Sequence, residues 1–448
     1  MKRKFYDTLL KWKREQGKTA LLIDGARRVG KSFIAQEFGK NEYKSVVYID
    51  FNIQDKNVVG FFENYIADLD SFFLYISNYF SVELYERDTL FIFDEVQMCP
   101  RARAAIKYLV ADGRYDYLET GSLVSINQNV QGIVIPSEER YEHMFPMDFE
   151  EFLWALGDET SFPAIRLFFE KKKPLGQALH RKFFDLFKLY MIVGGMPQAV
   201  LEYANTKNFE KTDRIKRDIL QLYRSDIAKH AKKQTLKANA IFDELPAQLQ
   251  KHEKKFTLAA IRKNARFREY ESAFMWLADA RIVLPAYNTT APNFGLKLNM
   301  DRLTQKLYMA DTGLLISHSF DEKNIVSEEI YKKILLGKLE FNSGMLMENI
   351  VAQSLHAAGH KLYFYSQNSP NAEDRMEIDF LISKSKITTR HNISAIEVKS
   401  SARYSLRSLQ KFMPKYAEQL DRAIVLHTAD LKKADNVLYL PVYMASLL

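Results

Sequence analysis

Hydrophobic residues occur in short continuous runs in the first third of the chain. Residues 21–23 and 90–93 are two such runs, and each is followed by polar residues. Apolar runs without polar alternation are typical of strands that are buried on both faces of a parallel sheet. The pattern predicts an α/β domain over residues 1–155, in which a parallel sheet is flanked by helices.

The pattern becomes mainly helical after residue 155. Within residues 209–231, Ile215, Ile219 and Leu222 recur near helical spacing. A glycine–proline break at residues 194–197 predicts the end of one domain and the start of the next. We expect a helical lid or linker over 156–205. Residues 206–325 suggest helices followed by a small hairpin, which predicts a winged-helix-like domain.

Strand-like segments dominate the last part of the chain. The order of helix, three strands, helix and strand predicts an α/β domain over residues 326–448. Glu348 lies inside the otherwise apolar first helix of this domain. Glu397 and Lys399 are two apart on a strand and therefore share a face, and Asp379 on the partner strand can approach them.

Composition is that of a globular protein. The chain has 448 residues, 47% hydrophobic and 27% charged, which suggests two to four domains. Cys99 is the single cysteine, so no disulfide forms within the chain, as expected in a reducing cytoplasm. The longest apolar run, residues 190–201, is too short to cross a bilayer. We expect a cytoplasmic protein with no membrane partner.

Positive charge is concentrated in the helical middle. Residues 207–237 contain ten Lys or Arg against four Asp or Glu, and residues 251–268 contain seven against one. Clustering of this kind is what a phosphate-contacting face requires, although a solvated helical face is the alternative. We expect DNA contact here, with Arg262, Lys263, Arg266 and Arg268 as the most compact group.

A phosphate-binding motif follows the first apolar run. The sequence GARRVGKS, residues 25–32, matches G-x-x-x-x-G-K-[ST]. Glycines let the backbone wrap around phosphates, and the following helix N-terminus faces the anion. Lys31 is expected to reach the terminal phosphates, and Ser32 to ligate Mg²⁺. The predicted nucleotide-binding residues are Gly25, Ala26, Arg27, Arg28, Val29, Gly30, Lys31, Ser32, Phe33, Asp94 and Ser122.

Two acids follow the second apolar run. Asp94 at the strand end is expected near the Mg²⁺ ion, and Glu95 is expected to orient or deprotonate the attacking water. Thr120 and Ser122 end a third strand and are candidates to sense the γ-phosphate, unless they are ordinary turn residues. Together with the phosphate motif, the two acids predict an ATPase that uses ATP and Mg²⁺.

Five motifs occur in a characteristic order: GARRVGKS, FIFDEVQ, TGSL, RYEHMFPMDFEEFL and YMIVGGMPQAV. They resemble the AAA-type ATP-binding proteins of bacteria and archaea that carry a C-terminal domain of uncharacterised function. The resemblance covers most of the chain. It implies that Arg140 is a transition-state arginine, acting in cis or in trans, although the family's Gly-Arg pair is Glu139-Arg140 here. A structural ion pair is the alternative. AAA-type ATPases often form rings, so a homo-oligomer stays open.

The C-terminal acids resemble those of the PD-(D/E)XK nuclease superfamily. The resemblance implies a restriction-nuclease-like fold, with Glu348, Asp379 and Glu397 as metal ligands and Lys399 as the catalytic lysine. The usual proline before the first acid is absent, because Ile378 precedes Asp379. The leading hypothesis is therefore an ATPase coupled to a DNA-binding half that cuts DNA with Mg²⁺. The alternative is a nucleotide-switched adaptor whose degenerate nuclease-like domain binds a protein partner without cutting.

Overall fold

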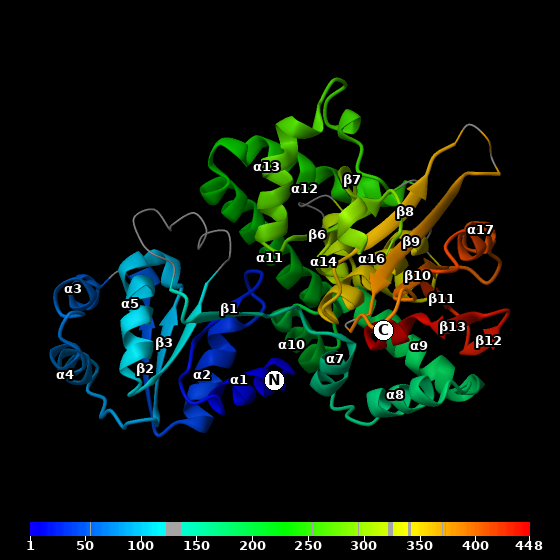
Figure 1. Cartoon of the computed structure of the whole chain (residues 1–448). Helices are drawn as coiled ribbons and strands as arrows, with labels where there is room; N and C mark the ends of the chain where they lie inside the picture. The colour runs from blue at the N-terminus through cyan, green and yellow to red at the C-terminus, as the bar shows by residue number, and fades with distance from the viewer. Residues whose placement is uncertain are drawn as a thin grey trace. The chain divides into compact units, whose positions relative to one another are not determined.

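The computed structural model describes residues 1–53, 55–121, 136–251, 254–293, 295–320, 326–338, 342–369, 371, 373–384 and 386–448 (Figure 1). The chain divides into two compact units, Met1–Phe145 and Pro146–Leu448. The division differs from the predicted boundaries, because residues 146–155 belong to the second unit and the boundaries expected near 205 and 325 fall inside it.

Unit 1 is built on a five-stranded sheet in the order β2-β3-β4-β1-β5, and every neighbouring pair is parallel. The strands are β1 (Ala20–Asp24), β2 (Ser45–Asp50), β3 (Thr89–Asp94), β4 (Asp116–Thr120) and β5 (Glu139–His143). The helices are α1 (Phe5–Lys13), α2 (Lys31–Glu42), α3 (Lys56–Asn64), α4 (Leu69–Phe80) and α5 (Pro100–Asp112). The predicted α/β domain with a parallel sheet is confirmed.

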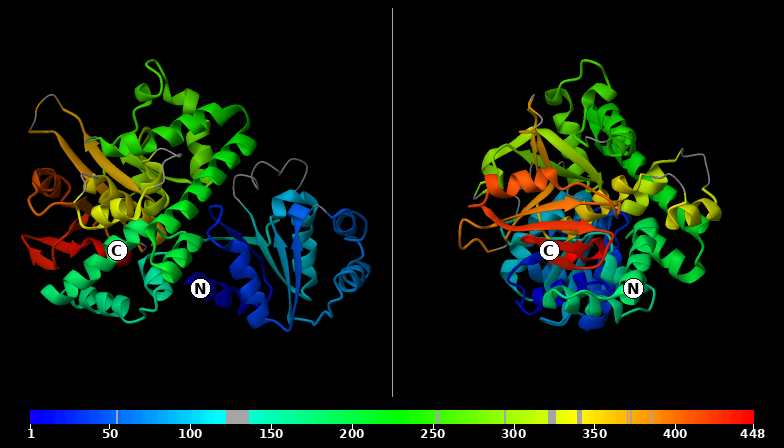
Figure 2. Two further views of the ribbon diagram at one scale, coloured as in Figure 1. Left: turned by 180° about the vertical axis from the view of Figure 1, so that it is seen from behind. Right: turned by 90° about the vertical axis from the view of Figure 1, so that its right-hand side faces the viewer.

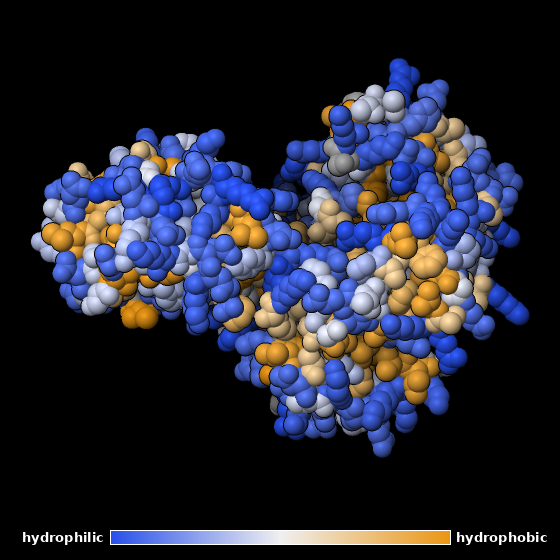
Figure 3. All heavy atoms as spheres, turned by 90° about the horizontal axis from the view of Figure 1, so that it is seen from below, coloured by the Kyte–Doolittle hydropathy of each residue, from blue (hydrophilic) through white to orange (hydrophobic). Residues whose placement is uncertain are grey.

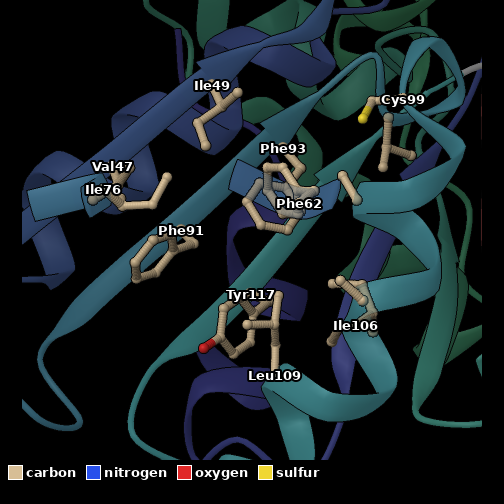
Figure 4. Packing of buried hydrophobic residues seen from close by; sticks show 14 of the residues in the cluster. Val47, Ile49, Phe62, Ile76, Phe91, Phe93, Cys99, Ile106, Leu109 and Tyr117 are labelled. Atoms are coloured by element: carbon tan, nitrogen blue, oxygen red, sulfur yellow. The ribbon is translucent and has the colours of Figure 1, made fainter. Parts of the chain in front are cut away.

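Helices cover both faces of this sheet, which is why its central strands are so apolar (Figure 2). On one face, Phe62 of α3 packs edge-to-face on Phe93 of β3 with ring centroids 5.5 Å apart (Figure 4). Ile106 of α5 and Tyr117 of β4 belong to the same core. Every residue of β3 is buried, so the continuous run at 90–93 reflects burial on both sides.

Unit 2 combines a helical region with a larger sheet. Its helices are α7 (Phe149–Ala155), α8 (Ser161–Lys171), α9 (Gln177–Val193), α10 (Pro197–Thr206), α11 (Phe209–His230), α12 (Thr235–Gln250), α13 (Phe267–Asp279), α14 (Thr312–His318), α15 (Glu328–Leu335), α16 (Ser343–Ala357) and α17 (Arg407–Lys415). Short 3-10 turns include η4 (Leu258–Ala260) and η6 (Val442–Leu447). Hydrophilic residues cover most of the face seen in Figure 3. Among the described residues, no helix is long and apolar enough to cross a membrane.

The sheet of unit 2 has the strand order β12-β13-β11-β10-β9-β8-β6-β7. Its strands are β6 (Val283–Thr289), β7 (Met300–Met309), β8 (Tyr363–Gln367), β9 (Met376–Ser383), β10 (Ile393–Val398), β11 (Leu420–His427), β12 (Lys432–Ala434) and β13 (Val437–Pro441). The hairpin β6–β7 was expected to be the wing of a separate winged-helix domain. Instead, β6 pairs with β8, so the predicted boundary at 325 divides one continuous sheet.

The glycine–proline segment at 194–197 is a packed joint inside unit 2. The backbone N–H of Gly195 donates to Asp311 Oδ2 at 2.6 Å. A Cβ on Gly195 would lie 2.1 Å from the carbonyl oxygen of Met147, and one on Gly313 would lie 2.5 Å from that of Val193. These close approaches explain the glycines. The turn-like sequence had indicated the end of a domain. The segment instead links α9 to α10 inside unit 2.

Candidate functional site

The phosphate motif forms the loop between β1 and the N-terminus of α2. Gly30 has a φ of 97° and immediately precedes Lys31, the first residue of the helix. A Cβ on Gly25 would lie 2.4 Å from the carbonyl oxygen of Met144, so only glycine fits there. The loop thus places the free N–H groups of α2 at the carboxyl edge of the parallel sheet, where phosphates bind in such folds.

Lys31 lies over this loop. Its ammonium donates to the carbonyl oxygens of Gly25 at 2.9 Å and Ala26 at 3.1 Å. Burial lowers the pKa of Lys31, while the carboxylates of Glu95, Asp24 and Asp94 act in the opposite direction. The lysine is therefore held among acids next to the helix N-terminus.

Asp94 collects three hydroxyl groups at the end of β3. Ser32 Oγ donates to Asp94 Oδ1 at 2.8 Å, and Tyr48 donates to Oδ2 at 2.5 Å. Thr120 also donates to Asp94, and its Oγ1 accepts from the backbone N–H of Glu95 at 3.2 Å. The fold brings Ser32 and Asp94 together, as an Mg²⁺ site requires. Thr120 contacts both Asp94 and Glu95. Tyr48 is a further contact of Asp94 that the sequence did not single out.

Glu95 has a left-handed backbone, with a φ of 53°. Such a conformation is uncommon for a residue with a side chain and often marks a functional site. Its carboxylate accepts a hydrogen bond from the side-chain amide of Gln97, which sequence reasoning missed although it lies only two residues away.

The other predicted nucleotide residues differ in exposure. Ala26 and Val29 are buried, Arg27 and Arg28 are exposed, and Phe33 is 54% exposed. Ser122 lies outside the described residues.

Arg3, which has no sequence motif, braces the loop. It donates from Nη1 to the carbonyl oxygen of Val29 at 2.9 Å and from Nη2 to that of Phe145 at 2.7 Å. No local pattern could have found it, because its partners lie 26 and 142 residues away.

Arg140 is not brought to the phosphate loop of its own unit. It lies on β5 opposite Leu21, three residues before the end of the parallel strand β1. Its Nη1 donates to both carboxylate oxygens of Glu15, at 2.7 and 2.9 Å. The structural ion pair accounts for this arginine, and the predicted role in cis is not supported by its position.

The C-terminal acids converge as the strand spacing predicts. Residues Ile396 and Phe380 are register partners in the antiparallel pair β9–β10, so Glu397 and Asp379 come next to each other. Asp379 Oδ2 accepts the backbone N–H of Val398 at 2.8 Å. We call Glu348, Glu377, Asp379 and Glu397 the acidic cluster.

Glu348 on α16 is buried among hydrogen-bond donors. It accepts from Tyr308 at 2.5 Å and from Lys306 at 3.3 Å, and it also pairs with Lys254. Burial alone would raise the pKa of Glu348, but the ammonium groups of Lys306 and Lys254 outweigh it and lower the pKa to about 2. Glu348 is thus an ionised counter-ion of two lysines.

The pKa values of Glu397 and Asp379 shift in the opposite direction. Burial, with the neighbouring charge of Asp379, raises the pKa of Glu397 to about 8. Burial and Glu348 raise the pKa of Asp379. Lys399 Nζ lies 2.5 Å from Glu397 Oε2, while the buried Oε1 has no hydrogen-bond partner among the described residues.

Lys306, on β7, is the residue that sequence reasoning missed. Its Nζ lies 2.8 Å from Glu377 Oε1, 3.3 Å from Glu348 Oε1 and 3.9 Å from Asp379 Oδ1. Within the described ranges, no group of three His, Cys, Asp or Glu residues is arranged to hold a metal ion. Lysine ammonium groups lie among Glu348, Asp379 and Glu397, and the role of these three acids as metal ligands stays a prediction.

The two basic stretches, residues 207–237 and 251–268, are only partly exposed on the surface of unit 2. Lys216, inside the first stretch, is buried and donates to the carbonyl oxygen of Ile192 at 3.0 Å. The compact group between η4 and the first turn of α13 is exposed, and in the part of the chain that the structure describes no carboxylate pairs with it. Its members are Arg262, Lys263, Arg266 and Arg268.

Comparison with known families separates the chain into three matched segments. Residues 17–153 match the family described as AAA domain. This segment is an AAA-type ATPase domain, and it covers unit 1 from residue 17 together with the first residues of unit 2. Residues 184–324 and 343–444 match two families that are each described as a domain of unknown function, DUF8612 and DUF4143. Neither description gives an activity, so the nuclease resemblance gains no support from them. No curated protein matched the chain.

Three solved structures illustrate the partial similarity of the chain to known structures. The Aeropyrum pernix ORC1 protein in complex with DNA is 8% identical with a TM-score of 0.26, covering 75% of this chain and 93% of that one. A DNA replication initiation factor is 14% identical with a TM-score of 0.22, covering 61% and 87%. AMPPCP-bound DnaA from Aquifex aeolicus is 14% identical with a TM-score of 0.25, covering 63% and 88%. At these TM-scores, function has to be argued from the residues of this chain.

Proposed function

We propose that the AAA domain hydrolyses ATP and that unit 2 binds DNA through its exposed basic group. The observation that carries the first part is the hydrogen bond between Ser32 and Asp94, beside Lys31 at the N-terminus of α2. A helix N-terminus, a lysine and a hydroxyl–carboxylate pair are the groups that a nucleoside triphosphate with Mg²⁺ requires.

Each side chain has a distinct role in the proposed hydrolysis. Backbone N–H groups of the loop bind the phosphates, and Lys31 exchanges its two carbonyl partners for phosphate oxygens. Ser32 and Asp94 would hold Mg²⁺, which when bound neutralises phosphate charge. Glu95 accepts a proton as a water oxygen bonds to the γ-phosphorus. The bond from that phosphorus to the β–γ bridging oxygen breaks, leaving ADP and phosphate.

ATP turnover by two variants tests this proposal. Lys31→Ala should weaken ATP binding and abolish turnover. Glu95→Gln should still bind ATP but turn it over at least ~10²-fold more slowly, because the proton acceptor is lost. Lys40→Ala, which removes an exposed lysine from the same helix, is the matched control and should turn over ATP like wild type. Wild-type rates in both site variants would refute the assignment.

DNA binding by unit 2 rests on the exposed, unpaired group at 262–268. If Arg262 and Lys263 contact phosphates, the double alanine variant should weaken binding and reduce the slope of log K against log salt by about 1.8. Lys171→Ala with Lys173→Ala removes the same charge from exposed positions on and just after α8 and is the control. Equal losses in both double variants would show that only net charge matters.

The lysines that contact the acidic cluster favour a second candidate function. In it, the protein is an adaptor whose unit 2 binds a protein partner without cutting DNA. Lys399 is paired with Glu397, and Glu348 is paired with Lys254 and Lys306, so these groups are engaged with one another. Incubation of plasmid DNA with Mg²⁺ or Mn²⁺ should give equal background for wild type and Lys399→Ala. Cleavage that depends on Lys399 would refute this view, whereas absence of DNA binding would favour the adaptor over the DNA-binding protein.

A further inference from the structure

We propose that Lys306 is the built-in cation of the acidic cluster, so that unit 2 does not take a divalent metal there. This inference concerns unit 2 alone and does not depend on ATP hydrolysis or on DNA binding. Its consequence is that removing one ammonium group should create a metal site that the wild-type protein lacks.

The geometry around Lys306 is that of a bound cation. Three carboxylate oxygens, from Glu377, Glu348 and Asp379, lie 2.8, 3.3 and 3.9 Å from its Nζ. Glu377 and Glu348 lie within hydrogen-bond distance of the ammonium, and Asp379 contributes its charge at longer range. A divalent ion shared by Glu348 and Asp379 would require the same space, because it too must lie between these two carboxylates.

Lys306 cannot leave this place easily. Its side chain is 1% exposed, and its strand β7 lies at the end of the sheet, where it pairs with β6 along most of its length. A lysine can move its charge to water only when its stem reaches the surface. Lys254, whose side chain is 13% exposed, pairs with Oε2 of Glu348, and Lys306 pairs with Oε1.

The charge count agrees with the geometry. The cluster has four carboxyl groups and is contacted by three ammonium groups, those of Lys254, Lys306 and Lys399. Buried charges have to be compensated, and here the protein itself supplies most of the compensation. Glu397 Oε1 is a fully buried carboxyl oxygen without a hydrogen-bond partner among the described residues. One such oxygen is fewer than the several ligands that Mg²⁺ requires in a fixed geometry.

The test is a titration of the nucleotide-free, full-length protein with Mn²⁺. The electron paramagnetic resonance signal of the free ion measures how much Mn²⁺ is bound. Wild type should show no site that half-saturates below about millimolar Mn²⁺. Lys306→Ala should bind one Mn²⁺ at least tenfold more tightly than wild type. Asp379→Asn added to Lys306→Ala should remove that gain, because it removes one of the freed carboxylates.

Lys384→Ala is the matched control. Lys384 belongs to the same unit and pairs with one carboxylate, Asp421 Oδ1, at 2.6 Å. It should behave like wild type, because a single carboxylate does not make a site. A similar gain in Lys384→Ala would show that any freed acid suffices, and would overturn the role of Lys306.

Two other results would overturn the inference. One is a micromolar Mn²⁺ site in wild type that Asp379→Asn abolishes, and this measurement decides the question even if Lys306→Ala fails to fold. The other is a folded Lys306→Ala, judged by its circular dichroism, with the Mn²⁺ affinity of wild type. Lys306→Met, which keeps most of the apolar stem, serves as a second variant with the same expectation.

Discussion

Replacing Glu348 by glutamine should destabilise unit 2 strongly. Glutamine keeps the shape and can still accept a hydrogen bond from Tyr308, but it removes the negative charge that Lys306 and Lys254 share. If Glu348 were a metal ligand in an open site, the same change would relieve repulsion between acids and cost little. The change in the free energy of unfolding therefore distinguishes a counter-ion of two lysines from a metal ligand.

The magnitude follows from the contacts that are lost. Two hydrogen bonds to charged groups contribute about 1.5–3 kcal/mol each. Lys306 keeps Glu377 as a partner, and Lys254 is exposed enough to recover some hydration. These compensations put the expected loss in the free energy of unfolding near 3–5 kcal/mol, as for other broken buried ion pairs.

The pKa of Glu348 leads to a similar value. A folded pKa of about 2 against the ordinary value of 4.5 corresponds to roughly 3 kcal/mol. Because the folded pKa is depressed, this stabilisation is present above pH 4.5 and is lost as the pH falls toward 2. Glu348→Gln should lose this part of the pH dependence.

Urea unfolding with hydrogen exchange read by mass spectrometry measures the effect. Exchange in peptides from α16 and β9 reports unit 2, and peptides from β3 report unit 1. The variant should lower the protection of the first set and leave the second unchanged. A loss below about 1 kcal/mol, the scale of an exposed ion pair, would refute the counter-ion role.

Three further predictions follow from other positions. Glu397→Gln should flatten the decline in stability between pH 4.5 and 8, measured by thermal unfolding, because the raised pKa of Glu397 makes the folded protein hold a proton that the unfolded chain loses over this range. Arg140→Ala should keep ATP turnover within about threefold of wild type, because the arginine is held away from the loop and cannot stabilise phosphate charge there. Gly195→Ala should cost about 3 kcal/mol in urea unfolding, because its Cβ would overlap the Met147 carbonyl oxygen, whereas Gly60→Ala in α3 meets only Asn64 and should stabilise by about 0.5–1 kcal/mol.

The approach of Ser32 to Asp94 could be predicted because its determinants are local. Residues 25–32 connect a strand to a helix, and Asp94 ends a strand in which residues 90–93 are all apolar. Parallel strands bring their carboxyl ends to one edge, so the contact between Ser32 and Asp94 follows from two short motifs. The position of Arg140 could not be predicted, because a motif does not reveal where along its strand a residue lies. Its register opposite Leu21 puts it away from that edge.

The sequence by itself determined the convergence of Asp379 and Glu397, because side-chain alternation on adjacent strands is a local rule. Only the tertiary structure decided what that convergence is for. Lys306 reaches Glu348 across 42 residues, because β6–β7 joins the C-terminal sheet and did not form a separate wing. Whether a buried acid holds a metal or a lysine depends on which element packs against it, and no spacing of acids records that choice.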